Sequence, residues 1–166
     1  HDGALATLKE GLHHHPEAAE LFVGLGFARL ARDEFAWARS AFGHAIALDP
    51  LIRDAWVGYG QTLLVLGETD RAIQVFDRAA EGTDAEDVDV LVHIGRTLGS
   101  HGEPGVAAKY LRYAYDMAPG HPDAATGMAA LLMMAGSYEE AETLLLDVLH
   151  VEPGHHEAAL YLGHLY

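Results

Sequence analysis

The sequence predicts an all-α solenoid in which one pair of helices is repeated along the chain. The first observation is a column of alanines spaced by 34, 34, 35 and 34 residues: Ala4, Ala38, Ala72, Ala107 and Ala141. A second column, of large apolar residues, keeps the same steps: Leu8, Phe42, Phe76, Leu111 and Leu145. A fixed period of this length is typical of stacked supersecondary units and not of a globule around one central site.

A third column contains small residues in the same register: Gly26, Gly60, Gly95, Ala129 and Gly163. Helices that approach closely need small side chains at the contact, and large residues then fill the space beside them. We therefore expect the three columns to meet where helices pack. All three carry the same one-residue insertion, which lies between Ala79 and Gly95.

Each period contains two helical patterns separated by short turns. In residues 53–66 the apolar residues recur at spacings of three and four, which places them on one helical face: Trp56, Tyr59, Leu63 and Leu66. Gly67 ends this helix, because glycine adopts the left-handed conformation at low cost. A second helix is expected over 69–81, with a buried side formed by Ala72, Phe76 and Ala79. Prolines interrupt the turns between units: Pro16, Pro50, Pro119 and Pro153.

Applied to the whole chain, the pattern predicts a single solenoid segment over residues 1–166. It comprises a half repeat, four full repeats and a second half repeat: 1–18, 19–52, 53–87, 88–121, 122–155 and 156–166. The chain opens inside a second helix (3–14) and closes within a first helix. Neither end carries the polar capping helix with which repeat arrays normally finish. We therefore expect the sequence to be an excerpt of a longer protein.

The composition excludes several classes of protein. A net charge of −15 opposes binding to nucleic acid or to anionic membranes, because affinity for phosphates comes from Lys and Arg. No apolar run reaches about 18 residues, so we expect no direct membrane insertion. The absence of cysteine removes disulfide scaffolds and thiolate zinc sites. The compartment stays open between cytoplasm and periplasm.

Negative charge is concentrated toward the carboxyl end. Lys and Arg stop at Arg112, and residues 113–166 contain eight acids: Asp116, Asp123, Glu139, Glu140, Glu142, Asp147, Glu152 and Glu157. This one-sign field indicates either solubility and salt adaptation or a docking surface for a basic partner.

The landmarks of these repeats resemble those of the tetratricopeptide repeat (TPR) family. Residues 18–50 and 55–80 carry the match most clearly, and the first of them contains Phe22, Leu25, Gly26, Ala38, Phe42, Ala45 and Pro50. The resemblance covers essentially the whole chain. It implies a right-handed superhelix of antiparallel helix pairs whose first helices line a concave groove. Departures from the family pattern occur at four positions: Arg29, Asp33, Ala125 and Ala159.

The twelve histidines raise the question of a metal site. His13, His14 and His15 are consecutive, so on a helix they point about 100° apart and do not meet one ion. His121 and His155 fall in successive turns, roughly one helix spacing of 10 Å apart, which is long for a shared ligand. We expect solvated turn residues, with no metal and no cofactor.

No catalytic constellation is visible either. The glycine pairs in 24–26 and 58–60 lie within expected helices and follow no strand, so helix packing explains them better than a phosphate-binding loop. No Ser, His and Asp set has a motif context. We expect this segment not to be an enzyme, while an enzymatic domain outside it stays open.

The resemblance places the candidate binding surface on the groove side of the first helices. The residues expected there are Asp54, Val57, Gln61, Leu64, Asp89, Val92, His93, Arg96, Asp123, Ala130, Met133, Met134, Leu160 and Tyr161. They combine a solvent-facing apolar strip with an acidic rail, defined as Glu20, Asp54, Asp89, Asp123 and Glu157. An acid in the first turn also complements the helix dipole by ~0.3 to 1 kcal/mol, so the rail has a structural explanation as well.

Together these observations favour a non-catalytic scaffold whose groove binds a protein or peptide with apolar anchors and basic flanks. Contiguous exposed apolar residues usually mark such surfaces. Three alternatives stay open. A neighbouring segment of the same protein fills the groove; the segment is the repeat arm of a larger enzyme or of a secretion or assembly machine; or its uncapped ends mediate self-association.

Overall fold

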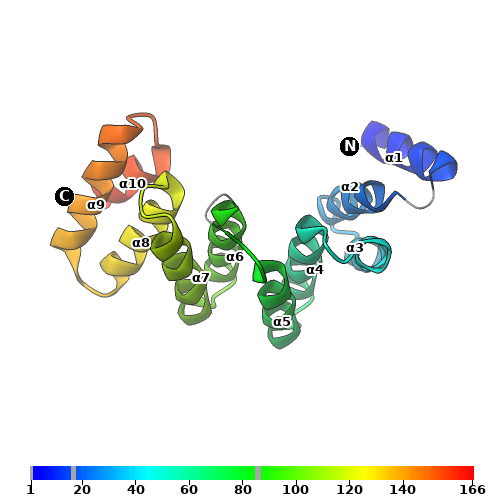
Figure 1. Cartoon of the computed structure of the whole chain (residues 1–166), viewed down its shortest axis with the longest axis horizontal. Coiled ribbons are helices and arrows are strands. Elements are labelled where there is room, and N and C mark those ends of the chain that lie inside the picture. Colours follow the sequence, from blue (N-terminus) through cyan, green and yellow to red (C-terminus); the bar gives the residue numbers. More distant parts are fainter. Residues whose placement is uncertain (1, 16–17, 85–86) are drawn as a thin grey trace. The chain divides into compact units, whose positions relative to one another are not determined.

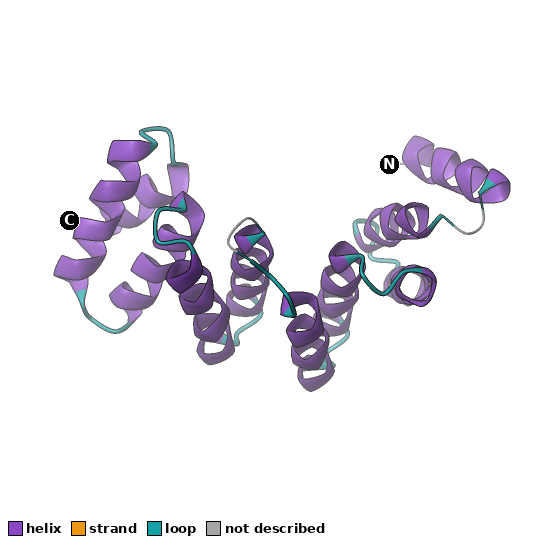
Figure 2. Cartoon of the chain, viewed as in Figure 1, coloured by secondary structure: helices purple, strands orange, loops and turns teal. Residues whose placement is uncertain are grey.

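The computed structural model describes residues 2–15, 18–84 and 87–166, and within these ranges it contains helices and no strand (Figure 1, Figure 2). The helices are α1 (Asp2–His14), α2 (Ala19–Leu30), α3 (Phe35–Leu48), α4 (Arg53–Val65), α5 (Thr69–Ala80), α6 (Val88–Ser100), α7 (Pro104–Met117), α8 (Pro122–Met134), α9 (Tyr138–Val151) and α10 (His156–His164). The predicted all-α class is confirmed. Of the helices in this described part, none combines the length and apolar character needed to cross a membrane.

The chain forms two compact units, His1–Glu81 and Gly82–Tyr166, which we call unit 1 and unit 2. In unit 1, α2 packs on α1, α3 and α4, and α4 packs on α3 and α5. In unit 2, α8 packs on α6, α7, α9 and α10, while α6 also packs on α7 and α9 on α10. Consecutive helices therefore pair, and alternate helices contact each other within a unit.

The alanine and large-residue columns lie in the core. Ala38, Ala72 and Ala141 are completely buried, as are Phe42 and Phe76. Ala4 belongs to the first of these columns, but its side chain lies outside the described residues, as does Pro16. The period that the sequence displays is thus the period of the helix interfaces.

In unit 1 the ring of Phe42 on α3 occupies the space left by two glycines. A Cβ atom added to Gly26 on α2 would lie 2.5 Å from the Phe42 ring, and one added to Gly58 on α4 would lie 2.3 Å from it. Phe27 completes the contact, with ring centroids 4.9 Å apart in an edge-to-face arrangement. The ring therefore fits only because both helices lack a side chain there.

Unit 2 repeats this contact with a smaller residue. A Cβ atom on Gly95 of α6 would lie 2.6 Å from Leu111 on α7, and one on Gly127 of α8 would lie 2.8 Å from it. Leu111 stands in the same column as Phe42. The same two-glycine contact is thus made by a leucine in place of an aromatic ring.

The turns inside the helix pairs share one conformation. Gly67, Gly102 and Gly136 have φ values of 78°, 84° and 81°, and Asp33 at the equivalent place has φ 59°. The next residue donates its N–H to a carbonyl five residues back in each turn, as Glu34 does to Arg29 at 3.0 Å. Asp33, a departure from the family pattern, therefore adopts the backbone that glycine adopts elsewhere.

Arg29, the second departure, has polar partners on the unit surface. Its guanidinium pairs with Glu34 and lies 5.6 Å from the ring centre of Trp37. Hydrogen bonds from Arg29, and next from Arg32, hold the pKa of Glu34 below its usual value. An ion pair and a cation–π contact thus replace the apolar packing expected at this position.

Two details differ from the sequence prediction. Leu66 is 40% exposed, because α4 ends at Val65 and Leu66 already belongs to the turn. The second helix of this pair ends at Ala80 and not at Glu81. Trp56 is partly buried, and its indole N–H donates to the carbonyl of Pro50 at 2.8 Å. This bond joins the helix to the preceding turn.

Replacing Gly58 by alanine is expected to lower the free energy of unfolding by about 1 to 3 kcal/mol, because the new methyl group overlaps the Phe42 ring. Gly43→Ala is the matched control. Gly43 is also helical, but a Cβ there meets nothing within 4 Å, so this variant should gain about 0.5 to 1 kcal/mol. Urea unfolding followed by circular dichroism measures both. A Gly58→Ala chain as stable as the Gly43→Ala chain would refute the packing role.

Replacing Asp33 by glycine is expected to raise the free energy of unfolding by about 0.5 to 1 kcal/mol. The left-handed backbone strains a residue with a Cβ by about 1 to 2 kcal/mol, and the greater freedom of unfolded glycine offsets part of that gain. The reverse change in an equivalent turn, Gly67→Asp, should destabilise by a similar amount. Thermal or urea unfolding checks the pair, and changes of the same sign would contradict the explanation.

Candidate functional site

A groove of about 620 Å³ opens on unit 2 between α6, α7, α8 and α10. Its lining residues are Gly95, Arg96, Gly99, Ser100, Pro104, Ala107, Leu111, Gly127, Ala130, Leu131, Met134, Glu157 and Tyr161. This volume lies within the range of pockets that hold ligands, which are mostly apolar with a few placed polar groups. The groove is therefore the candidate functional site of this unit.

Small residues make the hollow. Gly95, Gly99 and Gly127 present no side chain to it, and a Cβ on Gly99 would reach Ala107 only at 3.8 Å, an ordinary contact. Leu111 fills the space beside two of these glycines but carries less bulk than the aromatic residue of the same column in unit 1. Close helix packing and an open groove thus arise from the same glycines.

The charged edge of the groove is formed around Arg96. Its guanidinium lies 3.4 Å from Asp123 Oδ1 and also pairs with Glu157. The hydroxyl of Tyr161 donates to Glu157 Oε1 at 3.0 Å. Two acids of the rail are therefore already paired inside the unit, and the cluster carries one net negative charge.

The structure brings several of the predicted groove residues together. Arg96, Ala130, Met134 and Tyr161 line the groove, and Met134 is 70% exposed. Other predicted residues of unit 2 lie outside the lining: His93 and Leu160 are exposed, and Met133 is partly buried against the core around Leu145. In unit 1, Asp54 is exposed and Gln61 is partly buried.

Three predicted contact residues are not solvent-facing. Val57 and Leu64 are each 6% exposed, and Val92 is 3% exposed. The sequence assigned them to an exposed apolar strip, and this assignment is wrong for these three residues. A large apolar side chain on the groove side of a first helix becomes buried when it packs against neighbouring helices. The low exposure of all three residues indicates such packing. They belong to the core and do not offer free surface.

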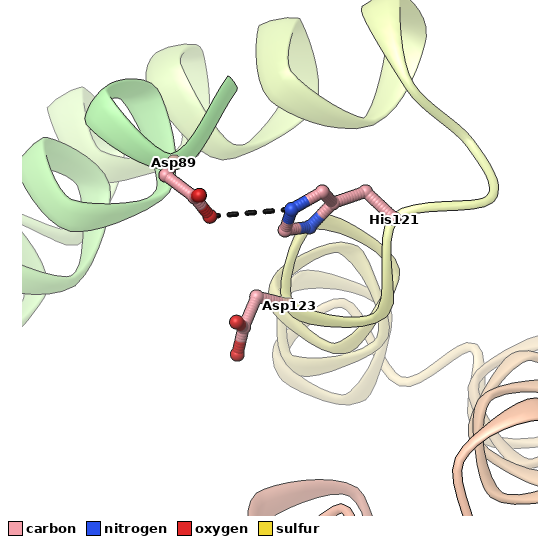
Figure 3. A group of neighbouring side chains, drawn as sticks. All are labelled: Asp89, His121 and Asp123. Atoms are coloured by element: carbon pink, nitrogen blue, oxygen red, sulfur yellow. Dashed lines mark ion pairs between the residues drawn. The ribbon is translucent and has the colours of Figure 1, made fainter. Parts of the chain in front are cut away.

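The acidic rail has histidine partners in unit 2. His121 Nε2 lies 3.2 Å from Asp89 Oδ1, and His155 Nε2 lies 3.3 Å from Asp123 Oδ1 (Figure 3 shows the first pair). Each histidine stands 32 residues after its acid and directly before a first helix. The pairs therefore tie the start of one first helix to the start of the previous one.

The two histidines differ at their other ring nitrogen. His155 Nδ1 accepts the N–H of Ala158 at 3.1 Å and so caps α10, whereas the buried Nδ1 of His121 has no partner among the described residues. The cap requires an unprotonated Nδ1, so in the neutral ring the proton of His155 sits on Nε2 and is donated to Asp123. His155 is thereby committed to a structural role.

In the described part of the chain, one group of side chains has its ligand atoms close enough together to hold a metal ion. It consists of Asp89, His121 and Asp123. One ligand atom from each lies within 4.8 Å of the others (Figure 3). Sequence reasoning considered the consecutive histidines, the pair His121 and His155, and His155 and His156 beside Glu157, and it missed this combination. The signal available was the shared register: an acid two places into one first helix and a histidine just before the next.

Sequence reasoning also missed the role of the glycines that form the groove. It interpreted Gly95 as a contact between helices and placed Gly99 and Gly127 on the groove side of the first helices, but it did not recognise that these glycines create the hollow. The pairing of Arg96 with Glu157 joins α6 to α10, 61 positions apart. Such a pair has no local signature.

The helix pairs, the turns and the glycine contacts define an α-helical repeat protein. Sequence models described as tetratricopeptide repeat match residues 21–87 and 100–165, which together make up most of the chain. The chain belongs to the tetratricopeptide repeat family.

Individual relatives have limited sequence identity to this chain. The anaphase-promoting complex subunit cut9 of Schizosaccharomyces pombe is 32% identical over 66 residues, which is 40% of this chain and 10% of cut9. The anaphase-promoting complex subunit CDC16 of Saccharomyces cerevisiae is 23% identical over 136 residues, 82% of this chain and 16% of CDC16. The chain thus spans a small part of the curated relatives that it matches.

Solved structures share the fold. The crystal structure of the hetero-tetramer Cut9–Hcn1 matches with a TM-score of 0.74 at 20% identity, over 97% of this chain and 32% of that one. YrrB, described as a TPR protein with an unusual peptide-binding site, matches with a TM-score of 0.62 at 22% identity, over 96% of this chain and 81% of YrrB.

Replacing His155 by alanine is expected to cost about 1 kcal/mol of unfolding free energy, because it removes the cap of α10 and leaves Arg96 as the partner of Asp123 that remains among the described residues. His121→Ala is the matched control, since His121 makes no capping bond and its pair with the exposed Asp89 is worth ~0 to 1 kcal/mol. Urea unfolding in metal-free buffer should rank His155→Ala as the less stable variant. The opposite order would contradict the assigned roles.

Proposed function

We propose that this chain is a non-catalytic protein-interaction module, and that the groove of unit 2 binds an apolar side chain carried by a basic peptide segment or helix. The observation that carries the proposal is the groove itself. It offers an apolar wall of Leu111, Leu131 and Met134 beside a charged edge at Arg96 and Glu157. Sites of this composition anchor a partner by burying an apolar side chain and orient it by a few polar contacts.

Charge favours a basic partner. Residues 82–166 contain 13 acidic residues and three Lys or Arg, so unit 2 carries −10 of the net charge of −15. Opposite charge on a partner speeds encounter and sets its orientation, and the effect weakens as salt screens it. A positively charged segment therefore suits this surface better than an acidic one.

The ion pairs of Arg96 also favour a basic partner. Because Asp123 and Glu157 already hold its guanidinium, a carboxylate of a partner would approach two like charges before it met the arginine. A lysine or arginine of a partner meets those carboxylates directly. We therefore do not assign the groove to capture of a peptide carboxylate.

The comparisons support the same class of function. YrrB is described as a TPR protein with a peptide-binding site, and cut9 is a subunit of the anaphase-promoting complex. The 66 residues that match cut9 make up a tenth of its length. On this basis the second candidate function is a repeat arm of a larger assembly, which holds other domains in place without binding a peptide in the groove.

Selection of a displayed peptide library on the 166-residue chain tests the groove. We expect enriched peptides to combine a large apolar residue with flanking Lys or Arg, and their affinity to fall as salt rises. Gly99→Leu should weaken binding of a selected peptide by at least about 10-fold, or about 1.4 kcal/mol, because the new side chain occupies the groove.

Gly43→Leu in α3 is the matched control, since it adds the same side chain at a helical glycine with open space and should leave the affinity unchanged. Met134→Asp provides a second groove variant at a residue that is 70% exposed. Circular dichroism confirms folding of all three. Peptides that bind the groove variants as well as the original chain, or a library that enriches nothing, would favour the repeat-arm function.

A further inference from the structure

We propose that Asp89, His121 and Asp123 form a binding site for one divalent transition-metal ion of the zinc type. The site lies in unit 2 at the amino-terminal ends of α6 and α8 (Figure 3). It does not depend on peptide binding in the groove, which it adjoins only through the contact of Arg96 with Asp123.

The geometry is close to that of a coordination sphere. One ligand atom from each residue lies within 4.8 Å of the others, and His121 Nε2 is 3.2 Å from Asp89 Oδ1. Ligand atoms held at zinc bond lengths of about 2.0 to 2.2 Å lie roughly 3.4 Å apart in a tetrahedron. The distance between His121 Nε2 and Asp89 Oδ1 is therefore already close to that between two zinc ligands. Rotation of an accessible aspartate side chain shortens the longer distances between ligand atoms.

The chemistry of the donors selects the class of ion. An imidazole nitrogen with two carboxylate oxygens suits zinc and its first-row neighbours, whereas magnesium and calcium prefer oxygen alone. Three protein ligands leave a coordination position for water. The Asp89 side chain is 76% exposed, so an ion reaches the site directly from solvent.

Two of the ligands are held by the fold. His121 is the residue before α8 and Asp123 is the second residue of that helix, so both are placed by the same helix start. His155 Nε2 and Arg96 approach Asp123 at Oδ1, which orients the carboxylate and leaves Oδ2 as the oxygen that an ion would meet. Hydrogen bonds to a ligating carboxylate of this kind are a usual part of metal sites.

The ring nitrogens explain why the site lies at His121 and not at the equivalent His155. The Nδ1 atom of His155 accepts the bond that caps α10, so its Nε2 keeps the proton and is not free to ligate. Among the described residues, the Nδ1 atom of His121 has no partner. With the proton of His121 on Nδ1, Nε2 gives up its contact with Asp89 and becomes a ligand, and the bonds of both side chains to the ion replace that contact.

The charges balance. Asp89 and Asp123 bring two negative charges to a dication, while Arg96 and Glu157 neutralise each other beside them. The −10 charge of unit 2 raises the local concentration of cations further.

Titration calorimetry of the 166-residue chain with zinc chloride tests the site. We expect Asp89→Asn and His121→Gln each to weaken the tightest zinc-binding event by at least about 10-fold. Asp54→Asn and His101→Gln are the matched controls, because Asp54 occupies the same place on the rail in unit 1 and His101 is an exposed histidine outside the cluster. Both controls should bind zinc like the original chain.

Anomalous scattering at the zinc edge, from crystals grown with zinc, should place one ion between the three side chains. Equal zinc affinity in Asp89→Asn, His121→Gln and the original chain would overturn the proposal and assign binding to other histidines. An ion located elsewhere would overturn it as well. Circular dichroism of the variants shows that a loss of affinity is not a loss of fold.

Discussion

The contact of one large apolar side chain with glycines on two successive first helices is the constraint on which the rest of the structure depends. Phe42 makes this contact with Gly26 and Gly58, and Leu111 makes it with Gly95 and Gly127. Sixteen positions separate each large residue from the glycine on either side. The contact sets how closely the helices approach within each unit, and close packing of this kind tolerates no added methyl group.

The candidate binding surface follows from the same constraint. Where an aromatic ring fills the two-glycine gap, unit 1 has a packed interior. Where leucine takes its place and Gly99 and Ala130 add further small residues, unit 2 keeps a groove. Within the repeated helix arrangement, a smaller side chain in the large-residue column thus accompanies an open groove.

Polar contacts then determine which carboxylates of this surface are unpaired. The sequence displays an acidic rail, but within unit 2 Arg96 bridges two of its members and two histidines approach two of them. The rail is therefore not a uniform row of free carboxylates. Asp89 stays largely exposed, and at the start of α8 it lies beside an imidazole nitrogen of His121.

The sequence by itself determined the period, the helices, the turns and the residues that meet in the core, because each of these depends on spacing along the chain. Ala38, Phe42 and Gly67 were correctly assigned for this reason. Only the tertiary structure decided which groove-side residues stay accessible. Val57 and Met134 were both assigned to the groove side of first helices, yet one is 6% and the other 70% exposed, because exposure depends on what neighbouring helices place over a side chain. The Arg96–Glu157 pair and the cluster at His121 were likewise decided by folding, which brings together atoms from helices far apart in sequence.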